Sequence, residues 1–301
     1  MKTVRAEAAP VALTDARRSS ALSDYIALTK PRLNFLVVLT SAAGYYLGSS
    51  GALNPWLMLE AVVGTALVAG GAAVLNQVYE RDTDALMRRT MQRPLPDRRV
   101  SAADAKVFGL ALATGGLLLL LVGTNALAAL LALATLVTYL VIYTPMKRRS
   151  PASTLVGAVP GALPPLIGWA AAHGSLAIGG WTLFAIVFVW QIPHFMAIAW
   201  LYRDDYRSAG FPMLPVIEPD GRRTGRQALI FAAALLPLSL VPSFVGLSGW
   251  TYFWVALVLG TALLALTVRF AATRSDGAAR WLFLGSITYL PLIWATMILD
   301  H

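Results

Sequence analysis

The chain has 301 residues, of which 57% are hydrophobic and only 13% are charged. Soluble globular domains have roughly 45 to 50% apolar and about 25% charged residues, so the composition argues against an ordinary soluble enzyme. The absence of cysteine excludes disulfide scaffolds, zinc ribbons and iron–sulfur clusters. The net charge of +9 does not indicate a nucleic-acid partner, because the basic residues flank apolar stretches of about 20 residues, long enough to cross a bilayer.

In chain order, the sequence predicts a flexible cytoplasmic tail at 1–24 and then one membrane domain at 25–301. The tail has no apolar core of signal-peptide length, and its acidic residues are atypical of a transit peptide. We expect an all-α integral membrane protein with nine transmembrane helices, in the apolar segments 33–48, 57–79, 107–123, 125–143, 153–171, 179–201, 228–247, 252–270 and 280–299.

Basic residues are confined to one side of this arrangement. If the first span runs outward, every Lys and Arg lies in the tail or in the loops near 80–106, 144–152, 202–227 and 269–280. The positive-inside rule then predicts a cytoplasmic N-terminus and a C-terminus on the opposite side. The weak transit-peptide signal favours a bacterial plasma membrane over an organellar one.

Three oxygen-bearing side chains follow one another at the inner end of the second span. Asn76, Glu80 and Asp84 are spaced i, i+4 and i+8, which places them in one stripe along a helix. Amide and carboxylate oxygens without His or Cys suit Mg²⁺ that also holds substrate phosphates. The alternative is an exposed acidic helix end paired with nearby arginines.

A second acidic pair follows the sixth span. Asp204 and Asp205, with Arg203 alongside, begin a loop that resembles the loop after the second span in length and in its order of acidic residues and prolines. Both loops emerge on the cytoplasmic face, so we expect the two acidic clusters to face one site and to hold metal together. An ordinary juxtamembrane charge cluster is the alternative.

Cations lie on the same membrane face as the acids. Lys147 and Arg148 follow Tyr143 in a short loop, and Arg93 lies in the long loop after the second span. Metal on one side and Lys or Arg on the other is the arrangement that stabilises a departing diphosphate. The alternative is that these residues only set the topology.

The sixth span contains the sequence Gln191-Ile192-Pro193-His194-Phe195. A titratable group next to a helix-kinking proline inside the membrane indicates a functional site. A His bonded to a neighbouring helix would explain the same residue.

Several motifs occur in order along the chain: Asn76-x3-Glu80-x3-Asp84, Arg89-Thr90-x2-Arg93-Pro94, Tyr143-Thr144-x2-Lys147-Arg148, Gly161-Ala162-x-Pro164-Pro165, Pro193-His194-Phe195 and Asp204-Asp205-Tyr206. Together they resemble the protohaem IX farnesyltransferases, or haem O synthases, a branch of the UbiA-type intramembrane prenyltransferases. The likeness runs from about Tyr25 to the C-terminus. It differs from the wider superfamily in one respect, because the second acidic motif there spaces its two Asp residues by four and here they are adjacent.

The resemblance implies a helical bundle around a central cavity open towards the cytoplasm. It implies transfer of a farnesyl group from farnesyl diphosphate to a vinyl group of haem B, a substrate rather than a cofactor, to form haem O for terminal oxidases. The metal ligands would be Asn76, Glu80, Asp84 and either Asp204 or Asp205, with Mg²⁺ as the metal; the diphosphate would be bound by Arg93, Lys147, Arg148 and Arg203.

The proposed chemistry assigns the remaining residues. Tyr143 would stabilise an allylic cation with its ring face, Lys147 and Asp205 would act at the diphosphate, and His194 would contact the haem. Partners would be the bilayer, the two substrates, and haem-biosynthesis or terminal-oxidase assembly proteins. The alternatives are a prenyltransferase for an aromatic quinone precursor and a secondary transporter, although transporters usually bind near the bilayer midplane.

Overall fold

The computed structural model describes residues 20–301, and every regular element in that range is helical. The elements are α1 (Ala21–Leu28), α2 (Pro31–Gly48), α3 (Pro55–Asp84), α4 (Ala102–Gly123), α5 (Ala126–Val137), the π-helix η1 (Thr138–Tyr143), α6 (Thr144–Met146), α7 (Ser153–His173), α8 (Ile178–Leu201), α9 (Arg203–Ser208), α10 (Leu214–Ile217), α11 (Arg222–Phe244), α12 (Trp250–Thr273) and α13 (Asp276–Leu299). The predicted fold class is confirmed.

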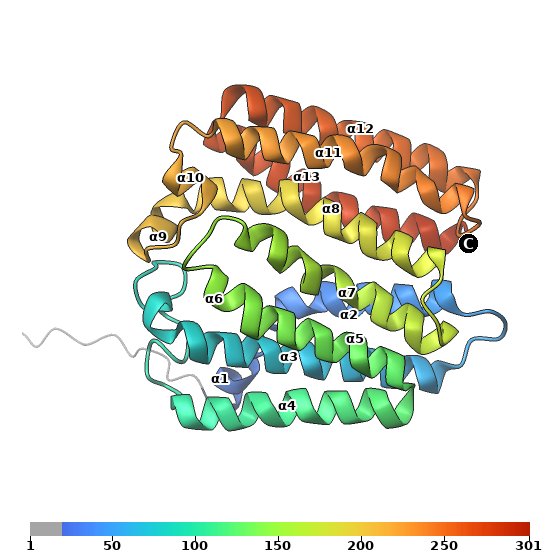
Figure 1. Cartoon of the computed structure of the whole chain (residues 1–301), viewed down its shortest axis with the longest axis horizontal. Coiled ribbons are helices and arrows are strands. Elements are labelled where there is room, and N and C mark those ends of the chain that lie inside the picture. Colours follow the sequence, from blue (N-terminus) through green and yellow to red (C-terminus); the bar gives the residue numbers. More distant parts are fainter. Residues whose placement is uncertain (1–19) are drawn as a thin grey trace, which may run out of the picture.

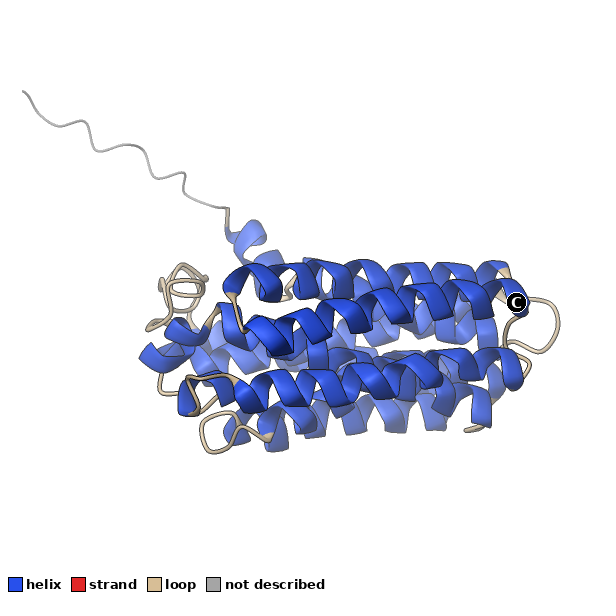
Figure 2. Ribbon diagram, turned by 90° about the horizontal axis from the view of Figure 1, so that it is seen from above, coloured by secondary structure: helices blue, strands red, loops and turns tan. Residues whose placement is uncertain are grey.

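The long helices lie side by side in one bundle (Figure 1). The short helices α6, α9 and α10 and the loop between α3 and α4 gather at one end in Figure 1. The C-terminus lies at the other end, as Figure 2 also shows. The loops that carry Lys and Arg are therefore at the same end of the molecule, as the topology prediction requires.

Eight helices of residues 20–301 are long and apolar enough to cross a membrane, and the protein is an integral membrane protein. The first predicted span, 33–48, forms the helix α2, but α2 is not among these eight helices. Its polar residues, which include Arg32, Asn34 and Thr40, lower its mean hydropathy. The count of nine spans thus stays a prediction.

Helix α2 is held in the bundle by direct backbone packing against α7. A Cβ atom at Gly44 would lie 2.0 Å from the carbonyl oxygen of Pro165, and one at Gly168 would lie 1.9 Å from that of Ser41. Small residues permit such an approach between helices in a membrane. Gly44 of the first predicted span and Gly168 of the fifth therefore let α2 and α7 approach each other.

The predicted boundary between tail and domain, after residue 24, falls inside α1. Ser20 caps this helix, because its hydroxyl accepts a hydrogen bond from the backbone N–H of Ser23 at 3.2 Å. Asp24 is buried and pairs with Arg99 of the loop between α3 and α4. The rest of the predicted tail, residues 1–19, lies outside the described residues.

Candidate active site

The acidic stripe lies buried at the end of α3. Asn76, Glu80 and Asp84 are 2%, 4% and 1% exposed, and the helix continues to Asp84, so the predicted spacing places them on one face. Asp82, between them in sequence, points the other way: its side chain is 88% exposed and pairs with Arg81. The alternative of an exposed acidic helix end is wrong for the stripe itself.

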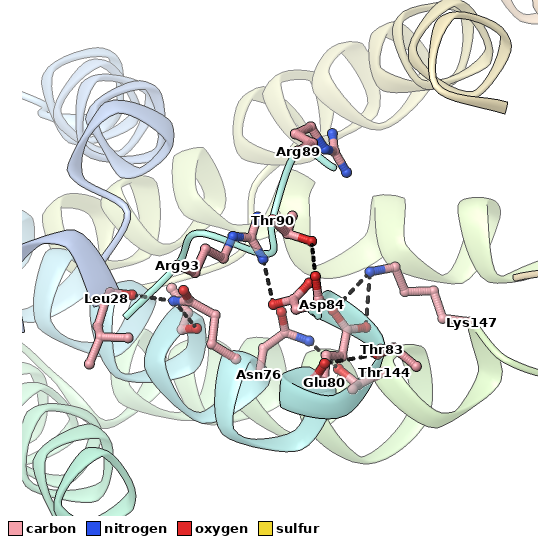
Figure 3. A network of polar contacts seen from close by, with 12 residues as sticks. Leu28, Asn76, Glu80, Thr83, Asp84, Arg89, Thr90, Arg93, Thr144 and Lys147 are labelled. Atoms are coloured by element: carbon pink, nitrogen blue, oxygen red, sulfur yellow. Dashed lines mark hydrogen bonds and ion pairs between the residues drawn. The ribbon is translucent and has the colours of Figure 1, made fainter. Parts of the chain in front are cut away.

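Each buried carboxylate has its own cation. Nζ of Lys147 lies 2.9 and 3.1 Å from the two carboxylate oxygens of Glu80, and Nη1 of Arg93 lies 2.7 Å from Oδ2 of Asp84. Figure 3 shows the two cations approaching the stripe from different sides. Buried charges require such partners, and the structure brings together two of the predicted diphosphate-binding cations and both carboxylates of the stripe.

The amide of Asn76 is oriented by Thr144. The Thr144 hydroxyl donates to the carbonyl oxygen of Tyr139 at 2.8 Å and lies 3.1 Å from Nδ2 of Asn76. Because a hydroxyl has a single proton to donate, it accepts from Asn76. The amide oxygen Oδ1 therefore points away from Thr144 and stays available as a ligand. We did not predict this role of Thr144 from the sequence.

A π-helix precedes the basic loop and positions its side chains. The turn at Thr138–Tyr143 widens to π geometry directly before Pro145, which has no N–H to donate and whose ring would crowd an α-helical turn. After it, the ammonium of Lys147 lies 5.6 Å from the ring centroid of Tyr143. Pro145 is the sequence signal for this feature, and π-turns are frequent at functional sites.

The two long loops meet at this end of the bundle. The backbone N–H of Arg89 donates to Oδ2 of Asp205 at 3.4 Å, and its guanidinium lies 4.7 Å from the ring centroid of Tyr202. The Ser208 hydroxyl donates to the carbonyl oxygen of Leu86 at 3.0 Å. Lys147, the partner of Glu80, is itself 5.2 Å from the ring centroid of Phe211 in the second loop. The segments around 80–93 and 202–211 thus converge.

Three predicted residues are engaged or oriented elsewhere. Arg203 donates to Oδ1 of Asp276 at 2.8 Å and to the carbonyl oxygen of Trp200 at 2.7 Å. The side chain of Asp204 is 80% exposed and pairs with Arg207. Arg148 is exposed and forms no ion pair within residues 20–301. Adjacent residues of a helix point about 100° apart, so only Asp205 of the acidic pair turns towards the first loop.

His194 lies deeper in the bundle, between aromatic rings. Its ring centroid is 5.1 Å from that of Trp190 and 5.3 Å from that of Phe283, with both pairs stacked. Nδ1 lies 2.8 Å from the hydroxyl of Ser286, which donates to the carbonyl oxygen of Phe283. Ser286 therefore accepts from Nδ1–H, and Nε2 of the neutral imidazole is the acceptor nitrogen. The bond to a neighbouring helix, our alternative for this residue, is present.

Lys30, which we did not single out in the sequence, lies at a corner that Gln77 of α3 holds through a 2.6 Å hydrogen bond from its Nε2 to the carbonyl oxygen of Leu28. It lies between α1 and α2 in the left-handed region, with φ 51°, which is uncommon for a residue other than glycine. Burial lowers the pKa of Lys30 to about 7; the charges of Arg93 and Lys147 add to this shift, and those of Glu80 and Asp84 oppose it. The only sequence signal is its position just before Pro31 and the first span.

The donor set fits Mg²⁺ as part of a substrate complex. No group of three His, Cys, Asp or Glu side chains in the described range could enclose a metal ion. Mg²⁺, however, is usually held by one or two carboxylates together with substrate phosphates. Two carboxylates and the free amide oxygen of Asn76 match that requirement.

Two hollows lie elsewhere on the protein. One, of about 520 Å³, is next to Asp82 and the start of α4, and the other, of about 470 Å³, lies between α2, α3 and α4. Neither is lined by the stripe. The central cavity open to the cytoplasm stays a prediction.

Comparison with known proteins identifies the family. Residues 37–291 match the model of the UbiA prenyltransferase family. The chain belongs to the UbiA prenyltransferase family. The predicted enzyme class, a prenyltransferase, is confirmed, and UbiA membership argues against the secondary-transporter alternative.

Curated relatives extend the match to nearly the whole chain. The chain is 48% identical over 290 residues to a protein from Solibacter usitatus named Protoheme IX farnesyltransferase, covering 93% of this chain and 99% of that protein. Proteins of the same name from Koribacter versatilis and Aquifex aeolicus are 45% and 41% identical, over 97% and 93% of this chain and 97% and 95% of theirs. The family resemblance that we inferred from the motifs is confirmed.

Solved structures share the fold. A digeranylgeranylglyceryl phosphate synthase superposes with a TM-score of 0.79 at 16% identity, covering 93% of this chain and 98% of that one. A UbiA homologue from Aeropyrum pernix superposes with a TM-score of 0.68 at 21% identity, covering 88% of this chain and 97% of that one. A UbiA homologue from Archaeoglobus fulgidus bound to GPP and Mg²⁺ superposes with a TM-score of 0.61 at 17% identity, covering 91% of this chain and 99% of that one.

Proposed function

We propose that this protein transfers the farnesyl group of farnesyl diphosphate to a vinyl group of haem B, giving haem O and diphosphate. The observation that carries the reaction class is the buried stripe of α3 with one cation for each carboxylate. The choice of haem B as acceptor and of farnesyl as donor follows the name of relatives that are 41 to 48% identical to this chain. Haem B is a substrate here.

Asn76, Glu80 and Asp84 are the proposed ligands of Mg²⁺. Asp205 is the proposed acidic ligand from the second loop, rather than Asp204, whose side chain is exposed and pairs with Arg207. Bound Mg²⁺ would neutralise charge on the departing diphosphate. Glu80 and Asp84 would then exchange their cations for metal, because a carboxylate that binds a divalent ion no longer needs its Lys or Arg partner. Lys147 and Arg93 would in turn bind diphosphate oxygens as charge-assisted donors. Arg203 is left out, because Asp276 holds it.

The reaction begins when the bond between C1 of the farnesyl chain and the diphosphate oxygen breaks, and the electron pair leaves with the diphosphate. The ring face of Tyr143, already next to the cation of Lys147, stabilises the allylic cation. The haem vinyl group attacks this cation and forms the new carbon–carbon bond. Water then adds to the resulting vinyl-derived cation and loses a proton, which leaves a hydroxyethylfarnesyl substituent. His194 contacts the haem through Nε2.

The proposed setting is a bacterial plasma membrane, with the basic end of the bundle and the N-terminal tail in the cytoplasm and residues 25–301 as the single catalytic domain. The arrangement of the basic loops at one end supports it (Figure 1). Proteins of haem biosynthesis or terminal-oxidase assembly are the proposed partners, since haem B must be delivered and haem O removed.

The acceptor is tested by incubating the purified protein with farnesyl diphosphate, Mg²⁺ and either haem B or 4-hydroxybenzoate. Mass spectrometry of the products is expected to show haem O and no prenylated benzoate. Prenylation of the benzoate alone would contradict the proposed acceptor and support the quinone-precursor alternative.

A further inference from the structure

The hollow at the start of α4 is a second charged site at the basic end of the bundle. Its volume of about 520 Å³ is within the range of small-molecule sites, and none of the stripe residues lines it. The residues that line it combine charged and apolar side chains: Arg81, Asp82, Ala85, Leu95, Pro96, Arg98, Val100, Ser101 and Ala102. Such a lining suits a ligand that is itself part charged and part apolar.

The last turn of α3 presents different charges on its two faces. Asp84 is buried at the stripe with Arg93, whereas Arg81 and Asp82 line the hollow. Arg81 pairs with Asp82 at 3.0 Å, but both side chains are exposed, and exposed pairs contribute little to stability. Arg98 forms no ion pair within residues 20–301. Two cations and one carboxylate leave the hollow with a positive charge, which attracts anions.

A packed loop holds Arg98 at the hollow. Its neighbours Leu95 and Val100 are buried in an apolar cluster with residues of α1, α3 and α4, and Arg99 turns the other way to pair with Asp24 of α1. Arg98 itself has φ 58°, in the left-handed region that is uncommon for a residue other than glycine. Backbone conformations of this kind persist where the surroundings impose them, and they are frequent at ligand sites.

The hollow lies at the depth of the lipid head groups. Helix α3 has 30 residues and is therefore about 45 Å long, whereas the hydrocarbon core is about 30 Å thick, so its last turns reach the head-group layer. Tyr79, one turn before Asp82, and Val107 of α4 are exposed, and Figure 1 shows α4 at the edge of the bundle. Exposed apolar side chains of spanning helices contact lipid, and Tyr is enriched at the membrane–water interface.

We propose that this hollow binds the phosphate of an anionic phospholipid, with Arg81 and Arg98 as the donors. Basic pockets between membrane helices bind such head groups, and the apolar lining would contact the glycerol and the first acyl carbons. A zwitterionic lipid carries its own cation, which the two arginines disfavour. Ser101 is not a donor to the lipid, since its hydroxyl donates to Asp104 at 2.7 Å. The site does not depend on the proposed reaction.

The test titrates the full chain in detergent with phosphatidylglycerol, with phosphatidylcholine of the same acyl chains and with inorganic phosphate, and measures binding by native mass spectrometry. The variants are Arg98→Asn, since Asn tolerates the left-handed backbone, and Asp82→Asn. Arg274→Asn is the matched control. Arg274 also has a left-handed backbone, with φ 48°, and it lies between α12 and α13 at the same end of the bundle but does not line the hollow.

Arg98→Asn is expected to weaken binding of the first phosphatidylglycerol by about tenfold, the usual loss for a hydrogen bond to a charged group. Asp82→Asn should strengthen it, because the variant frees Arg81 and removes a carboxylate that repels the phosphate. Arg274→Asn should match the wild type. Phosphatidylcholine should bind more weakly than phosphatidylglycerol and respond to none of the variants.

Unchanged phosphatidylglycerol affinity in Arg98→Asn would overturn the proposal. An equal loss in Arg274→Asn would overturn it as well, since general surface charge would then explain the binding. Asp82 is exposed, so Asp82→Asn tests the hollow in a folded protein, and weaker binding in that variant would contradict an anion site. Inorganic phosphate that bound as tightly as the lipid, and was lost in Arg98→Asn, would reassign the hollow to free phosphate.

Discussion

Asn76 donates a 3.1 Å hydrogen bond from Nδ2 to the hydroxyl of Thr144, across 68 residues of sequence. This bond joins α3 to the turn that carries Lys147, and it fixes which atom of the amide faces the stripe. Loss of a residue that orients a metal ligand typically lowers metal affinity or activity by about 10- to 100-fold. Thr144 is therefore a positioning residue for the proposed metal site.

Replacing Thr144 tests this role. Thr144→Val keeps the shape of the side chain but removes the hydroxyl that accepts from Asn76, so the amide loses its orientation. We expect the Mg²⁺ concentration for half-maximal rate to rise by about 10- to 100-fold. Initial rates of haem O formation measured against Mg²⁺ concentration will show it. Thr144→Ser, which keeps the hydroxyl, should resemble the wild type; a wild-type Mg²⁺ dependence in Thr144→Val would contradict the assignment.

Asp84 and Asp82 form a matched pair for testing the stripe. They lie on the same helix, but Asp84 is buried with Arg93 and Asp82 is exposed with Arg81. Asp84→Asn should lower turnover by roughly 10²- to 10³-fold, the scale for losing one electrostatic contact to the transition state. Asp82→Asn should keep wild-type activity in the same assay. Equal losses in both variants would contradict a role specific to the buried face.

Arg93 and Arg203 separate binding cations from structural ones. Arg93→Gln should raise the KM for farnesyl diphosphate by about tenfold, since a charge-assisted contact is lost. Arg203→Gln should leave that KM unchanged and lower the melting temperature, because its partner Asp276 begins α13. Steady-state kinetics and thermal unfolding in detergent measure the two effects. A raised KM in Arg203→Gln would restore our original prediction for this residue.

Gly168 tests the packing of α2 on α7. A methyl group there would meet the carbonyl oxygen of Ser41, so Gly168→Ala should destabilise the protein by about 1 to 3 kcal/mol, as overpacking usually does. Gly115→Ala is the control, since nothing lies within 4 Å of its Cβ position. Thermal or denaturant unfolding in detergent compares them. Equal stability of the two variants would show that α2 and α7 can separate without cost.

The stripe could be predicted from sequence because it depends on helix periodicity alone: Asn76, Glu80 and Asp84 needed only an unbroken α3. The loops were predicted to converge because both leave spans on the same face. The ion-pair partner of each charged residue could not be predicted. Lys147 is positioned next to Glu80 by the π-helix η1, and Arg203 pairs with Asp276 of another helix. Such pairings depend on side-chain direction in three dimensions.

Lys30 shows a second limit of the sequence. Its neighbours suggest a topology-determining lysine before a span, and nothing in the sequence shows that Gln77 draws this corner onto α3. Similarly, α2 was predicted from hydropathy as a span, although its place in the bundle depends on the glycine contacts with α7. Both positions depend on contacts between residues that are far apart in the sequence.

Product analysis of haem B incubated with farnesyl diphosphate and either wild-type protein or Glu80→Gln tests the central claim most directly. The wild type is expected to form haem O only when Mg²⁺ is present. Glu80→Gln should form none while keeping its helical circular dichroism at the assay temperature, although Lys147 loses its carboxylate partner and the melting temperature should fall. Haem O formed by Glu80→Gln at the wild-type rate, or by the wild type without a divalent cation, would contradict the account.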